Sequence, residues 1–137
     1  MKAFRISLFF ALLFYSEIFP VYAKDPVESI FSSLKDQNLQ EMAKLLSRNV
    51  NIRLASPEKV SGMFAKHGVL RVFKGIFSKY STYELKMLYR NEGDGSLFVA
   101  YDWTLKKNND IFRVSIIFTL ELKDREYYII NITSVDK

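Results

Sequence analysis

Two runs of alternating apolar and polar residues, joined by an Asn-Asn pair, constrain this chain more than any other feature of its sequence. They lie within residues 96–122, "SLFVAYDWTLKKNNDIFRVSIIFTLEL". Asparagine tolerates positive φ, so the pair predicts a two-residue hairpin turn that sets Trp103 opposite Val114. A slip of one residue would exchange the two faces, so we expect this register to hold wherever one face is buried. The face predicted to be buried is apolar throughout: Leu97, Val99, Tyr101, Trp103, Leu105, Phe112, Val114, Ile116, Phe118 and Leu120.

The opposite, outer face of this hairpin carries a carboxylate among mixed side chains. Asp102 faces Ser115 and lies diagonally from Arg113, within reach of a cross-strand ion pair. We therefore predict that Asp102 is an exposed charge on the outside of the sheet, away from the helices, and not a buried catalytic base. An exposed pair of this kind contributes about 0–1 kcal/mol to stability.

The outer face is also partly apolar, because Phe98, Ile111 and Ile117 stand on it. An exposed apolar patch larger than a few hundred Å² usually marks an interface. We expect two copies of the chain to pair through this face as a homodimer, with Asp102 and Arg113 within the contact.

The first 23 residues predict a secretory signal peptide. A basic start is followed by an apolar run over 6–15, and a Val-Tyr-Ala sequence ends at the small residue Ala23. A membrane anchor is the other interpretation, but polar residues and a proline interrupt the run before the roughly 20 apolar residues that a span needs. We expect an exported protein, periplasmic or secreted, with no stable membrane span after cleavage.

Residues 24–137 predict a single α+β domain. The chain has no cysteine, so no disulfide can form and the core alone must stabilise the fold. Caps at Asp25 and Asn38, with apolar residues at helical spacing, predict helices over 24–37, 38–46 and 65–80. Alternating and branched residues predict strands over 49–55, 60–64, 82–90, 97–106, 111–122 and 126–135. Three helices in the first part of the chain thus precede a long antiparallel meander.

This order of elements from Asp25 to Lys137 resembles the nuclear transport factor 2-like superfamily, above all its small secreted bacterial members of unknown function. The similar segments are "VESIFSSLKDQNLQEMAKLLSRNVNIRL", "FAKHGVLRVFKGIFSKY" and "FRVSIIFTLELKDREYYIINI". The resemblance implies a cystatin-like cone, in which a strongly curved antiparallel sheet wraps around three helices and leaves a cavity between them. It also implies frequent dimers through the sheet. It implies no activity, since the superfamily includes isomerases, dehydratases, transport adaptors and non-catalytic binding domains.

The predicted inner face offers little chemistry. It contains no Asp, Glu, Lys or Arg if the strand over 82–90 points Tyr83, Leu85, Met87 and Tyr89 inward. General acid–base catalysis needs a titratable group within hydrogen-bond reach of the substrate, so we predict no catalytic residue. A single histidine without cysteine predicts no metal site, and no cofactor is expected. Aromatic side chains are instead the candidates for lining a ligand pocket: Tyr89, Tyr101, Trp103 and Phe118.

The direction of the last strand, 126–135, stays open. A two-residue turn before it would point Asn131 and Thr133 inward, where they would be the best polar anchors for a ligand. A three-residue turn is favoured because it buries larger apolar side chains, namely Tyr128, Ile130 and Ile132.

Two functional classes follow. A non-catalytic module that binds a hydrophobic small molecule or peptide in the cone, or a partner on the sheet, is favoured by the apolar interior. The alternative is a small isomerase- or dehydratase-like enzyme that works through His67 and a tyrosine. The basic residues are scattered and do not form one run, so no nucleic-acid surface is predicted despite the net charge of +5.

Overall fold

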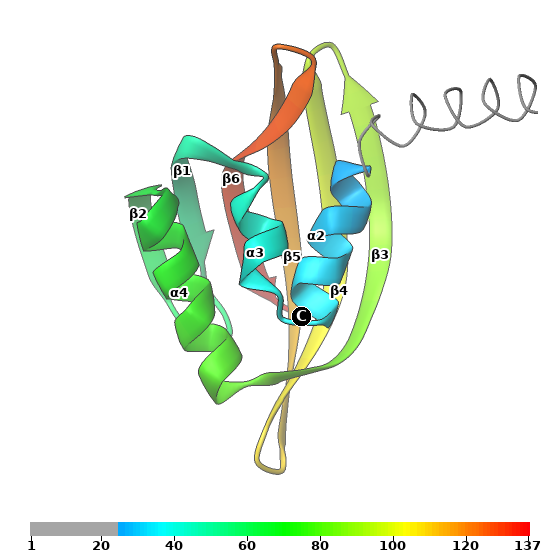
Figure 1. Cartoon of the computed structure of the whole chain (residues 1–137). Helices are drawn as coiled ribbons and strands as arrows, with labels where there is room; N and C mark the ends of the chain where they lie inside the picture. Colours follow the sequence, from blue (N-terminus) through cyan, green and yellow to red (C-terminus); the bar gives the residue numbers. More distant parts are fainter. Residues whose placement is uncertain (1–24) are drawn as a thin grey trace, which may run out of the picture.

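The computed structural model describes residues 25–137, so the predicted signal peptide over 1–23 lies outside the described residues. Three helices lie on one face of a six-stranded sheet whose strand order is β2-β1-β6-β5-β4-β3 (Figure 1). All neighbouring strands are antiparallel except β1 and β6, which run parallel. The predicted α+β class is confirmed. In chain order the elements are α2 (Pro26–Lys35), α3 (Leu39–Ala43), β1 (Leu46–Leu54), β2 (Val60–Ala65), α4 (Lys66–Lys79), β3 (Ser81–Gly93), β4 (Ser96–Lys107), β5 (Asp110–Lys123) and β6 (Glu126–Asp136).

Side-chain caps start the first two helices, as predicted. The Asp25 carboxylate accepts a hydrogen bond from the backbone N–H of Val27 at 3.0 Å, and Pro26 occupies the first turn of α2. The Asn38 side chain accepts from the amides at the start of α3. This helix is shorter than predicted because Leu46 already belongs to β1, where its partner in β6 is Ile129. Within the described residues, no helix is long and apolar enough to cross a membrane.

The β4–β5 hairpin has the predicted register. Lys107 pairs with Asp110, Trp103 with Val114, and Val99 with Phe118. The inner side chains of both strands are buried beneath the helices, apart from Phe112, which is partly buried and packs against the same core. This hairpin therefore forms the floor of the hydrophobic core.

The structure differs from the prediction in β3, because two β-bulges interrupt its pairing with β4. The register shifts between Thr82 and Glu84 and again between Met87 and Tyr89. Each extra residue reverses the faces of the residues that follow it. Tyr89 now pairs with Ala100 on the outer side, and the inward placement predicted for Tyr83 and Tyr89 is wrong: the two side chains are 64% and 49% exposed.

A third bulge decides the direction of β6. The preceding turn has two residues, Asp124 and Arg125, both with positive φ, so the favoured three-residue turn is wrong. The register then shifts between Thr119 and Leu120, which allows both Ile129 and Ile132 to be buried. Asn131 and Thr133 pair with outer-face residues of β5 and are only partly buried, so they do not point into the cone.

We expect the core to depend on the inner face of the hairpin. Phe118→Ala should lower the free energy of unfolding by about 3–5 kcal/mol, because it leaves a cavity among packed rings. The control Tyr83→Ala removes an exposed aromatic side chain and should change it by no more than about 0.5 kcal/mol. Urea unfolding measures both values, and similar losses in the two variants would contradict this assignment of the faces.

Candidate functional site

The centre of the cone is filled by aromatic side chains. Tyr101, Trp103 and Phe118, three of the predicted pocket residues, are fully buried. The ring of Tyr101 packs edge-on against Phe118, with centroids 6.2 Å apart, and Phe77 packs in the same way on Trp103 at 6.3 Å. These rings occupy the space in which the sequence predicted a cavity, and their contact with a ligand stays a prediction.

The polar atoms of these rings already have partners in the protein. The Tyr101 hydroxyl donates to the carbonyl oxygen of Val27 at 2.9 Å. The Trp103 indole N–H donates to the Thr82 hydroxyl oxygen at 2.9 Å, and that hydroxyl donates to the Leu34 carbonyl oxygen at 2.6 Å. Hydrogen bonds thus tie β3 and β4 to α2 and leave these groups little capacity for a ligand.

Burial also suppresses the acidity of the Tyr101 hydroxyl. Loss of water raises the pKa of Tyr101 far above its usual range, and the nearby Asp25 carboxylate raises it further. The Tyr101 hydroxyl therefore stays protonated at neutral pH and acts as a structural donor.

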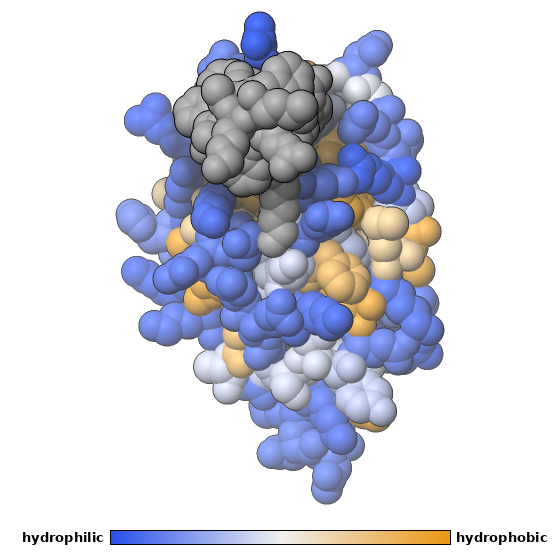
Figure 2. Space-filling view, turned by 45° about the vertical axis from the view of Figure 1, so that its right-hand side comes forward, coloured by the Kyte–Doolittle hydropathy of each residue, from blue (hydrophilic) through white to orange (hydrophobic). Residues whose placement is uncertain are grey.

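A pocket of about 480 Å³ opens at the mouth of the cone, between α2 and β3. Figure 2 brings the β3 side of the molecule forward and shows small apolar areas within a mostly hydrophilic surface. The Arg90 guanidinium lies at this mouth and pairs with the Asp25 carboxylate at 2.6 Å and with Glu92 at 3.5 Å. Alternation alone places Arg90 outside, and only the second bulge of β3 sets it opposite Val99 on the inner side. The residues that line the pocket are Asp25, Val27, Glu28, Phe31, Ser32, Met87, Arg90 and Tyr101.

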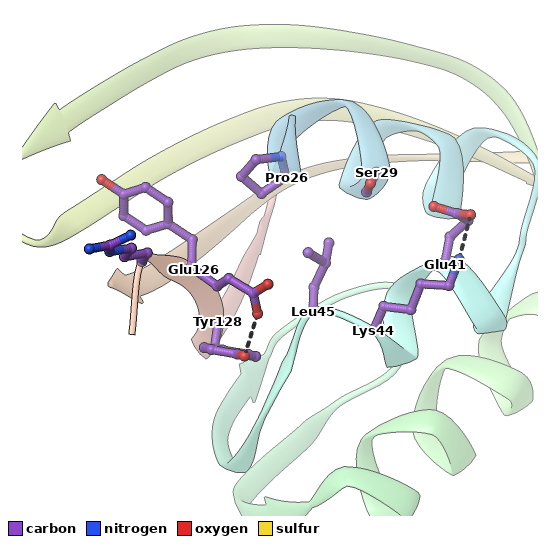
Figure 3. A pocket seen from close by; sticks show the side chains of 9 residues that line it. Pro26, Ser29, Glu41, Lys44, Leu45, Glu126 and Tyr128 are labelled. Carbon is purple, nitrogen blue, oxygen red and sulfur yellow. Dashed lines mark hydrogen bonds and ion pairs between the residues drawn. The ribbon is translucent and has the colours of Figure 1, made fainter. Parts of the chain in front are cut away.

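A second pocket, of about 350 Å³, lies between α2, α3 and the start of β6 (Figure 3). Pro26, Leu45 and Tyr127 contribute apolar surface to its lining. At its margin Lys44 forms an ion pair with Glu41 at 3.4 Å, and the neutral Tyr128 hydroxyl donates a hydrogen bond to the Glu126 carboxylate at 2.7 Å. The hydrogen bond to the Glu126 carboxylate raises the pKa of Tyr128. The lining holds two cations, Lys44 and Arg125, and two carboxylates, Glu41 and Glu126, so its formal charges balance.

His67 lines a third pocket, of about 460 Å³, and Tyr128 lines it too. The histidine is exposed at the start of α4, distant in sequence from the tyrosine that shares the pocket. The only histidine of the chain therefore lies at a surface hollow and not in the cone.

Asp102 lies on the outer face of the sheet, as predicted, but it is not exposed. Only 8% of the residue is accessible, because neighbouring strands and the end of the chain flank it. One carboxylate oxygen, Oδ2, accepts from Lys137 at 2.6 Å and lies 3.6 Å from the guanidinium of Arg113, the predicted partner. The other, Oδ1, is buried and has no hydrogen-bond partner among the described residues. A buried carboxylate oxygen without a donor is costly and calls for an explanation.

Apolar side chains extend over the same outer face. Phe98 is 38% exposed and Ile111 57% exposed, and Ile117 is partly buried beside them. Two further exposed residues enlarge this surface, Tyr89 through the bulge of β3 and Val135 through pairing with Ser115. We call these five residues, together with Asp102 and Arg113, the outer patch.

Comparison with solved structures identifies the fold. A DUF4783 family protein from Bacteroides ovatus has a TM-score of 0.65 and 22% identity, and the match covers 80% of this chain and 93% of that one. An NTF2-like protein from Cytophaga hutchinsonii has a TM-score of 0.62 and 9% identity, with 82% and 93% covered. The chain has a nuclear transport factor 2-like fold.

Enzymes share this fold with the chain. An LEH-like epoxide hydrolase from M. tuberculosis has a TM-score of 0.61 and 9% identity, and the match covers 82% of this chain and 80% of that one. At such identities the likeness shows the nuclear transport factor 2-like fold and nothing of activity. No family model and no curated protein matches the sequence.

The buried Tyr101 hydroxyl of this nuclear transport factor 2-like domain predicts how the free energy of unfolding depends on pH. Tyr101→Phe should lower the free energy of unfolding at pH 8 by about 1–2 kcal/mol, since the donor to Val27 is lost. The folded pKa of Tyr101 is raised, so its contribution is complete below the unfolded pKa of about 10 and falls as the pH rises above it. The deficit of the variant should therefore shrink between pH 8 and about pH 10.5. Urea unfolding at both pH values measures it, and a constant deficit would contradict the buried, neutral hydroxyl.

Proposed function

We propose that the chain is an exported, non-catalytic binding module that pairs with a second copy through the outer patch. The observation that carries the proposal is the exposed apolar surface of the outer face, where Tyr89, Phe98, Ile111 and Val135 are each between 38% and 57% exposed. A second copy that packs on this face would remove these apolar side chains from water.

The charges of the outer patch suit pairing about a two-fold axis. Arg113 is largely exposed and lies 3.6 Å from Oδ2 of its own Asp102, so its guanidinium has donors left for another acceptor. In a symmetric contact each Arg113 can reach the partner's Asp102, and the apolar residues of both copies bury one another around the two ion pairs. Burial of a carboxylate is tolerated when charged donors satisfy it.

The free edge of β3 is a poorer surface for association than the sheet face. Exposed edge strands are commonly protected by bulges and charges, and β3 carries both: two register shifts, with Glu84, Lys86 and Arg90 along the strand. The edge therefore discourages strand-to-strand pairing, and the face is the better candidate.

A non-catalytic role is supported by the state of the interior. Aromatic rings fill the cone, and their polar atoms bond to the protein. The enzyme alternative would have to use His67 with Tyr128 in a surface pocket, and the Tyr128 hydroxyl already donates to Glu126. The mouth pocket is a second candidate site, for an apolar small molecule or peptide, because Phe31, Met87 and Tyr101 line it beside Arg90.

Light scattering of residues 24–137 tests the pairing. At about 100 µM we expect twice the monomer mass. Phe98→Glu should weaken association at least about tenfold, since a charge would be desolvated in an apolar contact. The control Leu122→Glu changes a side chain of similar exposure, 43% against 38%, that lies opposite Tyr127 on the inner side of the sheet, and it should leave the mass unchanged. A monomeric wild-type chain would overturn the proposal.

A native mass spectrum of the chain after expression with its full N-terminus in a bacterial host tests export and ligand binding together. The protein recovered from the periplasm should lack residues 1–23, because cleavage follows Ala23. A reproducible additional small mass would support the mouth pocket as a ligand site, and its loss in Met87→Glu would locate it there. An intact N-terminus would contradict export by a cleaved signal, and a bare chain would count against a resident ligand.

A further inference from the structure

The third pocket lies where three separate segments meet. The start of β1, the junction of β2 with α4 and the β5–β6 hairpin surround a hollow of about 460 Å³. The parallel pairing of β1 with β6 is irregular beside it, because its register shifts between Leu46 and Asn51. The hollow is therefore built by the fold and lies apart from the outer patch.

Three cations converge on this pocket. Arg48 comes from β1, Lys66 from the first turn of α4, and Lys123 from the end of β5. All three are exposed, and none forms an ion pair with another described residue. The lining contains one acidic residue, Asp124, so positive charge is in excess. Like charges brought together by folding repel one another, and an anion between them would relieve the repulsion.

In the other two described pockets, two of the three lining cations form ion pairs, and only Arg125 forms none with another described residue. At the mouth of the cone Arg90 pairs with Asp25 at 2.6 Å, and in the pocket of Figure 3 Lys44 pairs with Glu41 at 3.4 Å. The third pocket alone among the three described combines several cations with no such pairing. Its charge is thus available to an external partner.

The start of α4 adds to this positive field. Unlike α2 and α3, it has no side-chain cap and no acidic residue in its first turn, and it begins with Lys66 and His67. Cations are unfavourable at the positive end of a helix, where a negative group is preferred. A bound anion would offset both the helix dipole and the side-chain charges.

We propose that this pocket binds a phosphate group, held by Arg48, Lys66 and Lys123. The Arg48 guanidinium can donate two parallel hydrogen bonds to phosphate oxygens, and the two lysines act as point charges beside it. The phosphate can belong to a soluble phosphate ester or to a lipid headgroup. The site is independent of the outer patch, so its test neither requires nor examines pairing of two copies.

Titration of residues 24–137 with inorganic phosphate, followed by amide chemical shifts at constant ionic strength, tests the site. We expect saturable shifts at residues 65–68 and 123–124, and no such shifts with chloride. Arg48→Gln and Lys66→Gln should each raise the dissociation constant about tenfold through loss of a charged donor. The control Lys74→Gln removes an exposed cation later in α4 and should leave it unchanged.

Unchanged amide shifts away from the pocket establish that each variant remains folded. Sedimentation with phosphatidylglycerol and phosphatidylcholine vesicles separates the two sources of phosphate. Binding to the anionic vesicles that Arg48→Gln abolishes assigns a lipid headgroup, whereas saturable phosphate binding without vesicle binding assigns a soluble ester. Shifts that do not saturate, or that persist equally in Arg48→Gln, would overturn the proposal.

Discussion

Packing of the inner face of β4 and β5 against three helices is the interaction on which the rest of this structure depends. The chain has no cysteine, so no covalent link supplements the core. Tyr101, Trp103 and Phe118 bury their rings from the sheet side, and the hydrogen bond from Tyr101 to Val27 fixes α2 on them. The domain gains stability by filling the space that other proteins can use as a cavity, because buried apolar area and close packing are its main sources of stability.

A filled interior moves the candidate chemistry to the outside of the molecule. The outer face of the sheet holds Asp102, whose Oδ1 has no hydrogen-bond partner among the described residues, and exposed apolar side chains lie around it. The surface pockets differ in charge: the one in Figure 3 is lined by as many cations as carboxylates, whereas the pocket beside α4 has three cations that are unpaired with described residues and one carboxylate. The outer patch and the surface pockets therefore differ in shape and in charge, although all of them are built on one sheet.

The β4–β5 hairpin could be predicted because two adjacent strands alternate without interruption, and a slip of one residue would bury Asp102 among the helices. The side-chain directions in β3 and β6 could not be predicted in this way. Met87, Leu88 and Tyr89 are consecutive apolar residues, so nothing in their pattern marks a bulge. In β6 the buried Ile129 and Ile132 are three residues apart, a spacing that no regular strand can place on one face. These bulges place Arg90 at the mouth pocket and turn Asn131 outward. Neither position could be predicted because the alternation of residues does not reveal the bulges. The burial of Asp102 escaped prediction because its cover comes from β6 and the last residue of the chain.

Intermolecular methyl NOEs test most directly whether two copies of the chain contact each other through the outer patch. An equal mixture of isotope-labelled and unlabelled residues 24–137 reports only contacts between copies. We expect NOEs from the methyl groups of Ile111, Ile117 and Val135 to the partner, and none from Ile116 or Ile132, whose side chains are buried in the core. Absence of intermolecular NOEs at about 1 mM, where even a weak pair would be populated, would contradict the account.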